Sequence, residues 1–424
     1  MGRPSTPEKV VVVGLILPDI SRSTAEEHLY ELEKLVETAG GIVVRKVFQE
    51  RKSRDAATFI GKGKAEEVKK IVAELTANLV IFDDDLSPAQ ARNLQEIIGT
   101  EVIDRSALIL DIFARQARSK ESRTQVELAQ LNYLLPRLTR QWSHLSRQAG
   151  GIGSRGVGET QLELDRRMTR TRIARLKEDL AKIEKNRETQ RKGRHDVFTV
   201  ALVGYTNAGK STLFNQLTKG SAEAVDKLFA TLDAKLQKSF FEMPRPTVII
   251  DTVGFIRKLP HHLVASFRST MEEAASADLV LHVINLTHPH MEEQLEVANE
   301  VLKELGVPPE RIIEVYNKAD LDVERRRQPR QHSSVTISSL TGAGIEALVR
   351  MIHDRVLAEG EVLHLEIPLD ESKVIARLHE VGEIYHQAAS DHHLRFVAWV
   401  PKEQIYQFSG FSSGRAADPI ARIS

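Results

Sequence analysis

The chain has 424 residues, of which 41% are hydrophobic and 28% are charged, and its formal net charge is zero. This composition excludes a disordered chain, and the complete lack of cysteine excludes disulfide scaffolds, zinc–thiolate sites and thiol chemistry. A chain of this length is expected to form roughly two to four domains. It has no apolar run of membrane-spanning length and no signal-peptide core in its first ten residues. We therefore expect a cytoplasmic protein, with peripheral membrane association as an alternative.

The first 114 residues alternate between strand and helix patterns and predict a small α/β domain. Ser23 followed by Glu26 is a capping pattern for the first helix, which should end at Gly40, and Pro88 suits the first position of the third helix. The segment FIGKGK at 59–64 resembles a phosphate loop but lacks the Lys-Ser/Thr ending, so we interpret it as a basic turn before the second helix. The predicted strands are 9–17, 41–48, 79–86 and 101–104, and the predicted helices are 23–40, 64–75 and 87–98.

Residues 115–195 predict long helices with an excess of positive charge. Between residues 115 and 194 there are 20 lysines and arginines against 9 aspartates and glutamates, an excess of 11 positive charges. Two helical patterns flank the segment GGIGSRGVGETQLELDRR, which has five glycines between residues 150 and 158. A basic segment with a glycine-rich loop suggests binding to an RNA backbone, whereas the alternatives are a solvated helical surface and a disordered hairpin tip. The candidate RNA contacts are Arg147, Arg155, Arg166 and Arg167.

The segment GYTNAGKS at 204–211 fits the pattern G-x-x-x-x-G-K-[ST], which cradles phosphates in nucleotide-binding proteins. A buried strand pattern precedes it at 198–204 and a helix pattern follows at 211–218, which is the order that phosphate binding at a helix N-terminus needs. Lys210 would contact the β- and γ-phosphates, and the Ser211 hydroxyl would bind Mg²⁺. The alternative is an ordinary strand-to-helix turn. The predicted nucleotide-binding residues here are Gly204, Tyr205, Thr206, Asn207, Ala208, Gly209, Lys210, Ser211 and Thr212.

A second phosphate motif, DTVG at 251–254, follows a hydrophobic strand pattern. Asp251 would hold Mg²⁺, usually through water, and the N–H of Gly254 would contact the γ-phosphate. Thr231 lies between the two phosphate motifs and is the candidate switch threonine, with its hydroxyl on Mg²⁺ and its N–H towards the γ-phosphate. The metal ligands are therefore predicted to be Ser211, Thr231 and Asp251. The nucleotide-binding residues predicted in these segments are Phe229, Ala230, Thr231, Asp251, Thr252, Val253 and Gly254.

The base would be recognised by NKAD at 317–320, which ends another strand pattern. Asp320 can accept hydrogen bonds from the N1–H and the 2-amino group of guanine, a donor pair that adenine lacks. Asn317 and Lys318 would brace this loop, and a turn at 338–340 would approach the guanine oxygen. Because ligands bind at the carboxyl edge of open α/β sheets, the four motifs together predict a guanine-nucleotide site. The base-binding residues are predicted to be Asn317, Lys318, Asp320, Ser338, Ser339 and Leu340.

These motifs resemble those of the HflX-type GTPases, in the Obg–HflX group of translation-factor-related GTPases. The resemblance covers about residues 10–400 and rests on GGIGSRGVGETQLELDRR, GYTNAGKSTLFNQLT, LFATLD, DTVGFIRKLPHHLVASFRST and NKAD. It implies a protein that binds the large ribosomal subunit and its ribosomal RNA and, with GTP, splits stalled or stressed ribosomes. Three positions depart from the family pattern. Val157 replaces a proline of the glycine-rich loop, DAKLQ replaces a more basic continuation after LFATLD, and Ser339 replaces an alanine.

The resemblance also sets expectations for chemistry. Lys210, Thr231 and Gly254 would act in GTP hydrolysis, and Mg²⁺ would be the cofactor. Phe255 stands where many such switches carry a glutamine and cannot orient water by a hydrogen bond, so we expect slow intrinsic hydrolysis that the ribosome stimulates. Asn207 suggests a bound K⁺ in resembling GTPases, or is only a turn residue. We expect a monomer and leave ATP open as a second nucleotide. The alternative functions are a GTP-dependent ribosomal assembly factor and an RNA-remodelling ATPase or RNA-binding protein.

After residue 360 the patterns predict a strand at 361–368, a helix over 371–390 and a strand at 394–401. The whole chain is thus predicted to be a multidomain α/β protein. Its parts would be an N-terminal α/β domain (1–114), a basic helical subdomain with the glycine-rich loop (115–195), a P-loop GTPase domain with a mostly parallel sheet (196–358) and a small C-terminal α/β domain (359–424).

Overall fold

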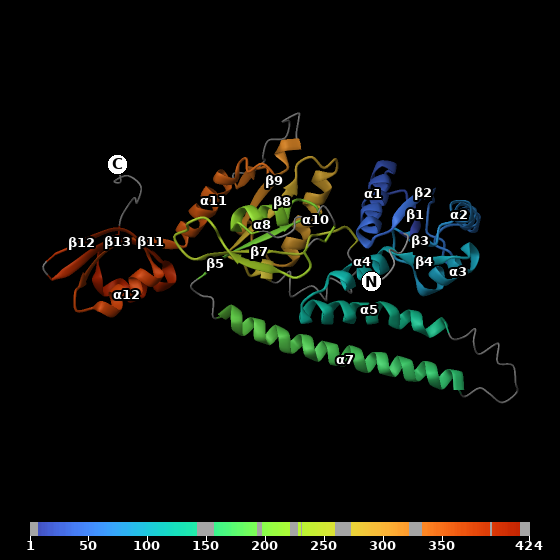
Figure 1. Cartoon of the computed structure of the whole chain (residues 1–424), viewed down its shortest axis with the longest axis horizontal. Coiled ribbons are helices and arrows are strands. Elements are labelled where there is room, and N and C mark those ends of the chain that lie inside the picture. Colours follow the sequence, from blue (N-terminus) through green and yellow to red (C-terminus); the bar gives the residue numbers. More distant parts are fainter. Residues whose placement is uncertain are drawn as a thin grey trace. The chain divides into compact units, whose positions relative to one another are not determined.

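The computed structural model contains two compact units. Figure 1 shows its helices and strands, coloured along the sequence. The first unit contains Met1–Arg187, Val225–Asp233 and Ile256–Ser269, and the second contains Glu188–Ala224, Ala234–Phe255 and Thr270–Ser424. Two short segments of the central region thus pack with the N-terminal part of the chain. The predicted four-part division is finer than this and stays a prediction. The structure describes residues 7–141, 157–192, 197–220, 228–229, 231–258, 273–321, 333–390 and 392–415.

The first unit begins with a parallel sheet in the order β2-β1-β3-β4. Residues Val10–Val13 of the central strand β1 are at most 1% exposed, as expected for a parallel strand covered on both faces. The predicted capping residue of α1 was wrong by two positions, because the hydroxyl of Ser21, not of Ser23, accepts the hydrogen bond from the N–H of Thr24. The elements are β1 (Lys9–Ile16), α1 (Arg22–Ala39), β2 (Ile42–Glu50), α2 (Lys62–Leu75), β3 (Leu79–Phe82), α3 (Pro88–Ile98) and β4 (Glu101–Asp104).

Three further helices belong wholly or mostly to the first unit: α4 (Arg105–Gln116), α5 (Lys120–Gln141) and α7 (Val157–Lys192), whose last five residues fall in the second unit. The sequence patterns predicted no helix at the position of α4, which lies almost entirely within the predicted N-terminal α/β domain. The helices α5 and α7 run alongside each other in Figure 1, and Leu128, Ile173 and Leu176 form the core between them. The guanidinium of Arg172 binds both carboxylate oxygens of Glu127, at 2.7 and 2.8 Å. This helical hairpin is therefore held by an apolar seam with an ion pair at its border.

The second unit contains a six-stranded sheet in the order β10-β9-β8-β5-β7-β6. All neighbouring strands are parallel except β6, which pairs antiparallel with β7, so the predicted mostly parallel sheet is confirmed. Helices α8 and α11 contribute Leu213, Leu217, Leu348 and Ile352 to its core. The elements are β5 (Phe198–Gly204), α8 (Lys210–Thr218), β6 (Lys235–Lys238), β7 (Thr247–Asp251), β8 (Leu279–Asn285), α10 (Met291–Glu304), β9 (Ile312–Asn317), β10 (Ser334–Thr336) and α11 (Ile345–Ala358).

The C-terminal part is an antiparallel sheet in the order β12-β13-β11-β14, with α12 against it. The predicted helix over 371–390 was wrong in its second half, because the chain becomes extended at Gly382 and continues as β12, which pairs with β13. A glycine there ends the helix, and the residues after it are half-buried or exposed as in an edge strand. The elements are β11 (Gly360–Pro368), α12 (Ser372–Val381), β12 (Glu383–Ala389), β13 (His393–Pro401), the 3₁₀ helix η3 (Lys402–Phe411) and β14 (Ser412–Arg415).

Trp399 of β13 joins the C-terminal sheet to the core of the six-stranded sheet. Its side chain is 1% exposed and belongs to the same apolar cluster as α11 and the parallel sheet. The indole N–H donates a hydrogen bond of 3.0 Å to the carbonyl of Leu357, at the end of α11. A Cβ on Gly360 would lie 2.2 Å from the indole ring, so only glycine fits there.

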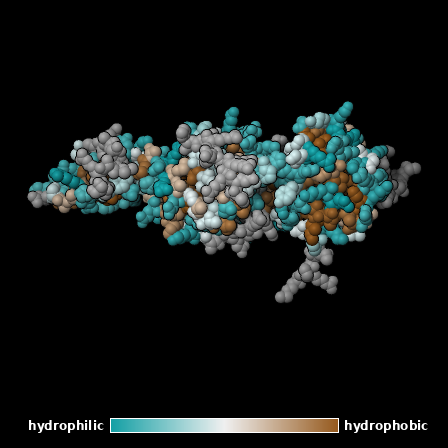
Figure 2. All heavy atoms as spheres, turned by 90° about the horizontal axis from the view of Figure 1, so that it is seen from above, coloured by the Kyte–Doolittle hydropathy of each residue, from teal (hydrophilic) through white to brown (hydrophobic). Residues whose placement is uncertain are grey.

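Hydrophilic side chains cover most of the described surface that is visible in Figure 2, and hydrophobic residues gather in separate patches. None of the helices in the described part of the chain is both long and apolar enough to cross a membrane.

Candidate nucleotide-binding site

The segment 204–209 forms a tight loop between β5 and α8, at the carboxyl edge of the parallel sheet. Gly204 and Gly209 have φ values of 144° and 94°, which favour glycine. A Cβ on Gly204 would lie 2.1 Å from the carbonyl oxygen of Val283, and one on Gly209 would lie 2.2 Å from the amide nitrogen of Asn317. At both positions the positive φ and the lack of space for a Cβ require glycine. An ordinary turn would not impose both conditions.

Lys210 begins α8 and is only 7% exposed. Its ammonium donates hydrogen bonds to the carbonyl oxygens of Gly204 and Tyr205, at 3.0 and 2.8 Å, which holds it across the loop. Burial lowers the pKa of Lys210 to about 8, although Asp251 raises it in part. A phosphate group beside this ammonium would favour its charged form. The geometry suits the predicted role of Lys210 in binding phosphates.

The two predicted metal ligands of the second unit lie together. Asp251 ends β7 with no exposed surface, and its carboxylate accepts a 3.0 Å hydrogen bond from the hydroxyl of Ser211. A hydroxyl next to a carboxylate is an oxygen-only donor set, which fits Mg²⁺. Thr252, the next residue, donates from its hydroxyl to the carbonyl of Leu202 and so ties the end of β7 to β5.

Gly254 lies directly against the phosphate loop. A Cβ at this position would be 2.8 Å from the methyl group of Thr206 and 2.9 Å from the ammonium of Lys210. The next residue, Phe255, is bonded to the loop on both sides: its N–H donates to the carbonyl of Gly204, and its carbonyl accepts from the N–H of Thr206. The DTVG segment and the phosphate loop thus form one hydrogen-bonded unit.

Asn317 connects the phosphate loop to the predicted base-binding turn. It is 1% exposed, and its amide donates a 2.8 Å hydrogen bond to the carbonyl of Ala208. Its side-chain oxygen accepts hydrogen bonds from the N–H and the hydroxyl of Ser339, at 2.9 and 2.7 Å. Ser339 replaces the usual alanine here, and its hydroxyl adds one bond to this bridge.

The carboxylate of Asp320 is exposed and is oriented by the hydroxyl of Ser338, which donates to it at 2.5 Å. A residue that the sequence patterns missed, Gln216 of α8, donates at 3.1 Å to the carbonyl of Ser339 and so supports the same turn. Its place in an amphipathic helix pattern gave no signal of this contact. Leu340 is 76% exposed at the tip of the turn, and Lys318 has a φ of 67°.

The candidate switch threonine belongs to the first unit. Thr231 is 5% exposed and Phe229 is 2% exposed, whereas Ala230 lies outside the described residues. The structure therefore brings together the motifs at 204–212, 251–254, 317–320 and 338–340, but not Thr231, within the second unit. The roles of all these residues towards nucleotide and metal stay predictions.

The chain also changes units directly after Phe255. Lys258 lies in the first unit, where its ammonium binds the carboxylates of Asp83 and Asp84 at 2.6 and 2.9 Å. Burial alone would raise the pKa of Asp83, but Arg105 and Lys258 outweigh it and lower this pKa. The residues that follow the DTVG motif are therefore held by an acidic cluster at the end of β3.

The predicted RNA contacts lie on α7 or outside the described residues. Arg166 and Arg167 line a shallow depression on α7 together with Arg170 and Leu164. Arg147 and Arg155 fall in the part of the chain that the structure does not describe. The RNA contacts stay a prediction.

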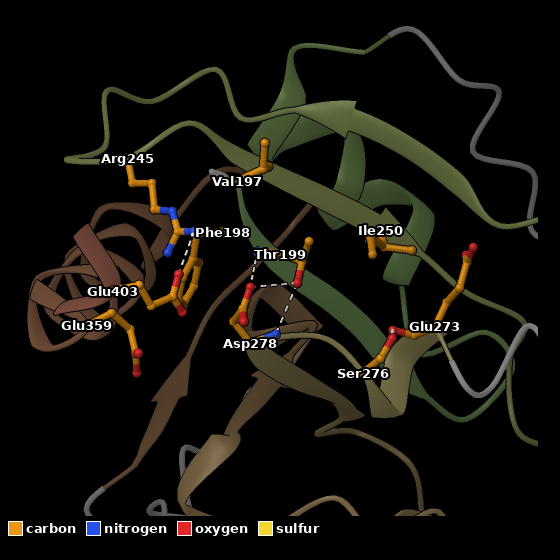
Figure 3. A pocket seen from close by; sticks show the side chains of 10 residues that line it. All are labelled: Val197, Phe198, Thr199, Arg245, Ile250, Glu273, Ser276, Asp278, Glu359 and Glu403. Carbon is orange, nitrogen blue, oxygen red and sulfur yellow. Dashed lines mark hydrogen bonds and ion pairs between the residues drawn. The ribbon is translucent and has the colours of Figure 1, made fainter. Parts of the chain in front are cut away.

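A polar cavity of about 180 Å³ lies beside the start of β5, at the end of that strand opposite the phosphate loop (Figure 3). Asp278 accepts hydrogen bonds there from the N–H and the hydroxyl of Thr199, at 2.7 and 2.8 Å. Arg245 points towards Glu403, 4.0 Å away. The cavity contains none of the predicted nucleotide-binding residues, so we do not place the nucleotide in it.

Three family models match consecutive parts of the chain. They are described as the N-terminal part of a GTP-binding GTPase (residues 26–114), the middle region of that GTPase (residues 116–194) and a 50S ribosome-binding GTPase (residues 199–318). The N-terminal and middle regions are thus matched as well as the nucleotide-binding domain.

Curated relatives match most of the chain. GTPase HflX of Caldanaerobacter subterraneus is 45% identical over 380 residues, which cover 89% of this chain and 87% of the relative. GTPase HflX of Escherichia coli is 45% identical over 365 residues, covering 84% and 86%. A crystal structure of a GTP-binding protein from Sulfolobus solfataricus with GDP is similar at 26% identity, covers 82% of this chain and 98% of that one, and has a TM-score of 0.44. The resemblance that the motifs indicated is confirmed by the relatives: this chain belongs to the HflX family of ribosome-binding GTPases.

Proposed function

We propose that this protein binds and hydrolyses GTP, associates with the large ribosomal subunit, and in its GTP state splits stalled or stressed ribosomes into subunits. The observation that carries the proposal is the bridge made by Asn317, which joins the phosphate loop to the turn beside Asp320. Phosphate and base recognition are thereby built into one hydrogen-bonded frame. A frame of this kind is what a guanine-specific switch needs.

Guanine selectivity would reside in Asp320. Its carboxylate is exposed at the rim of the sheet and is oriented by Ser338, so it can accept from the two neighbouring donors of guanine. Adenine has no such pair and would leave the carboxylate without its donors. This supports GTP rather than ATP as the nucleotide, and competition of ATP against a bound fluorescent GDP tests it directly.

At the phosphate end, Lys210 would bind the β- and γ-phosphates, while Ser211 and Asp251 would hold Mg²⁺. The ion would neutralise charge on the phosphates when it is bound. The N–H of Gly254 would meet the γ-phosphate, and the absence of a side chain allows that close approach.

Hydrolysis needs a water aligned with the γ-phosphate, and Phe255 cannot provide this alignment. Its side chain is 5% exposed and apolar, and both of its backbone polar groups are already bonded to the phosphate loop. We therefore propose that the large ribosomal subunit supplies the missing positioning or charge. Equal rates of GTP hydrolysis with and without added large subunits would contradict this proposal.

Sedimentation of intact ribosomes separates ribosome splitting from subunit assembly. We expect that the protein with a nonhydrolysable GTP analogue converts intact ribosomes into subunits, whereas an assembly factor would bind without splitting them. The matched control is Asp320→Asn, which should lose splitting with the GTP analogue and regain it with the corresponding xanthosine analogue. Splitting by this variant with the GTP analogue at the wild-type concentration would show that Asp320 does not select the base.

A further inference from the structure

The segment that carries the candidate switch threonine is fixed on both sides of Thr231. It belongs to the first unit, and Leu228 and Leu232 are buried there, at 7% and 4% exposure. Two residues before Thr231 a side chain contacts α4, and two residues after it a side chain contacts the connection between α4 and α5. Through these two contacts, a movement of the segment can be passed to α4 and to the start of α5.

The first contact is aromatic. The ring of Phe229 packs edge-to-face on Phe113 of α4, with centroids 4.6 Å apart and an angle of 77° between the planes. Both side chains are at most 2% exposed. Phe229 has a φ of 57°, a backbone conformation that a bulky residue adopts only where its surroundings hold it. The ring contact is therefore a firm anchor.

The second contact is polar and falls at the start of α5. One carboxylate oxygen of Asp233 accepts hydrogen bonds from the N–H groups of Arg118 and Ser119, both at 3.1 Å. The other oxygen accepts from the hydroxyl of Ser119 at 2.5 Å. The same hydroxyl of Ser119 accepts from the N–H of Ser122, in the first turn of the helix.

A carboxylate next to the N-terminus of α5 stabilises the start of that helix. The first N–H groups of a helix have no partner within it, and the helix dipole favours negative charge there. Ser119 thus caps α5 with its hydroxyl. Asp233, a residue more than a hundred positions further along the chain, holds Ser119 in place and puts a carboxylate beside the helix N-terminus.

We propose that Asp233 is a positioning residue which couples the nucleotide state sensed at Thr231 to the helical hairpin of α5 and α7. The coupling rests on the proposed function, since it needs Thr231 to respond to the γ-phosphate. Two residues span at most about 7 Å, so Thr231 cannot move far unless Asp233 leaves α5 or carries it along.

The helical hairpin would transmit a movement at the start of α5 to α7. Helix α5 is packed on α7 through Leu128 and Leu176 and is clamped to it by the two bonds between Arg172 and Glu127. Helix α7 carries Arg166, one of the candidate RNA contacts. A change at the start of α5 therefore reaches the basic face that would grip ribosomal RNA.

The test compares full-length wild-type protein with Asp233→Ala in binding to large ribosomal subunits, once with GDP and once with a nonhydrolysable GTP analogue. We expect the variant to bind GDP within about twofold of wild type. The preference of the subunit for the GTP-analogue form should fall by at least about fivefold, the low end of couplings between sites. The matched control is Asp111→Ala, which removes an exposed carboxylate of α4 that pairs with Arg115.

Ser119→Ala removes the hydroxyl bond to Asp233 and the cap on the N–H of Ser122, and should also lower the preference for the GTP-analogue form. The losses in the double variant should be less than additive, because both single variants lose the bond between the Ser119 hydroxyl and Asp233. This also guards against a variant that merely folds poorly. Additive losses in the double variant would contradict the proposed coupling.

Hydrogen exchange of the amides at 118–124 gives a readout without ribosomes. Wild type should exchange these amides at different rates with GDP and with the GTP analogue, whereas Asp233→Ala should exchange them rapidly with both. Equal protection with both nucleotides in wild type would overturn the proposal, as would a wild-type subunit preference in Asp233→Ala. If wild-type protein itself shows no nucleotide-dependent subunit binding while its exchange at 118–124 still depends on nucleotide, the proposed function fails and the coupling stands.

Discussion

Replacing Asn317 by alanine should remove the hydrogen-bonded bridge between the phosphate loop and the predicted base-binding turn. The side chain is buried, donates to the carbonyl of Ala208 in the phosphate loop, and accepts from two groups of Ser339 in the base-binding turn. Alanine removes all three bonds and leaves the N–H of Ser339, which is 2% exposed as a residue, without this acceptor. The phosphate loop and the turn then have no direct link through this position.

The size of the effect follows from these contacts. Each buried hydrogen bond contributes about 1 kcal/mol net, and a buried group left without its partner costs about 1–3 kcal/mol. Rotation of the Ser339 hydroxyl and entry of water recover part of this, so we expect a total loss of about 3 kcal/mol. If about 2 kcal/mol of it appears in nucleotide binding, the Kd for GDP rises by about 30-fold. The remainder should appear as lower stability of the second unit.

Isothermal titration of GDP into the Asn317→Ala variant measures the change. The matched control is Asn285→Ala, since Asn285 ends β8 opposite Asn317 and its side chain accepts exposed hydrogen bonds from the N–H and the hydroxyl of Thr287. The control should bind GDP within about twofold of wild type, because exposed hydrogen bonds contribute little. A folded Asn317→Ala variant with a Kd within about threefold of wild type would refute the view that this bridge organises the pocket.

Three further outcomes are expected. Lys258→Met should lower the free energy of unfolding of the first unit by about 1–2 kcal/mol in urea titrations, because Asp83 is 3% exposed and loses one of its two cations. The control Lys34→Met removes the exposed ion pair between Lys34 and Glu37 and should lower the same free energy by less than about 0.5 kcal/mol. Burial, with Arg257, Lys258 and Arg105, lowers the pKa of His28 to about 4 against the opposing effect of Asp83. As the pH falls, the unfolded chain, with a histidine pKa of about 6.5, takes up this proton before the folded chain does. The contribution of His28 to the free energy of unfolding is therefore fully present above about pH 6.5 and is lost as the pH falls from about 6.5 to 4. His28→Gln should flatten this decline, and an unchanged urea midpoint profile would contradict the assignment. Replacing K⁺ by Na⁺ should slow GTP hydrolysis by wild type more than by Asn207→Ala, and equal rates in both salts would exclude a role for potassium.

The nucleotide motifs were accessible from sequence because each is local. Gly204 and Gly209 are the first and last residues of a tight six-residue segment, and Asp251 ends a strand whose residues are mostly apolar. The parallel sheet then brings the four motifs to one edge, as the order of strands and helices predicts. The family assignment and the mostly parallel sheet followed from the same local patterns.

Features that depend on distant contacts were not predictable in this way. Asp233 gives no sign in the sequence that it holds the residues before α5, because its partners Arg118 and Ser119 are far away along the chain. Gln216 looks like any polar helix residue until the base-binding turn folds over it. The boundary at Gly382 was missed because an amphipathic pattern continues past it, and only pairing with β13 decides for a strand.

The buried indole of Trp399 has a mechanical consequence. It fastens the antiparallel sheet to the last turn of α11. The first residue of α11, Ile345, follows closely after the predicted base-binding turn at 338–340. A displacement of the antiparallel sheet would therefore act through α11 on the predicted base-binding turn at 338–340, whereas the segment that ends at Asp233 is bonded to Arg118 and Ser119 of the first unit. Trp399 and Asp233 thus support separate parts of the predicted site.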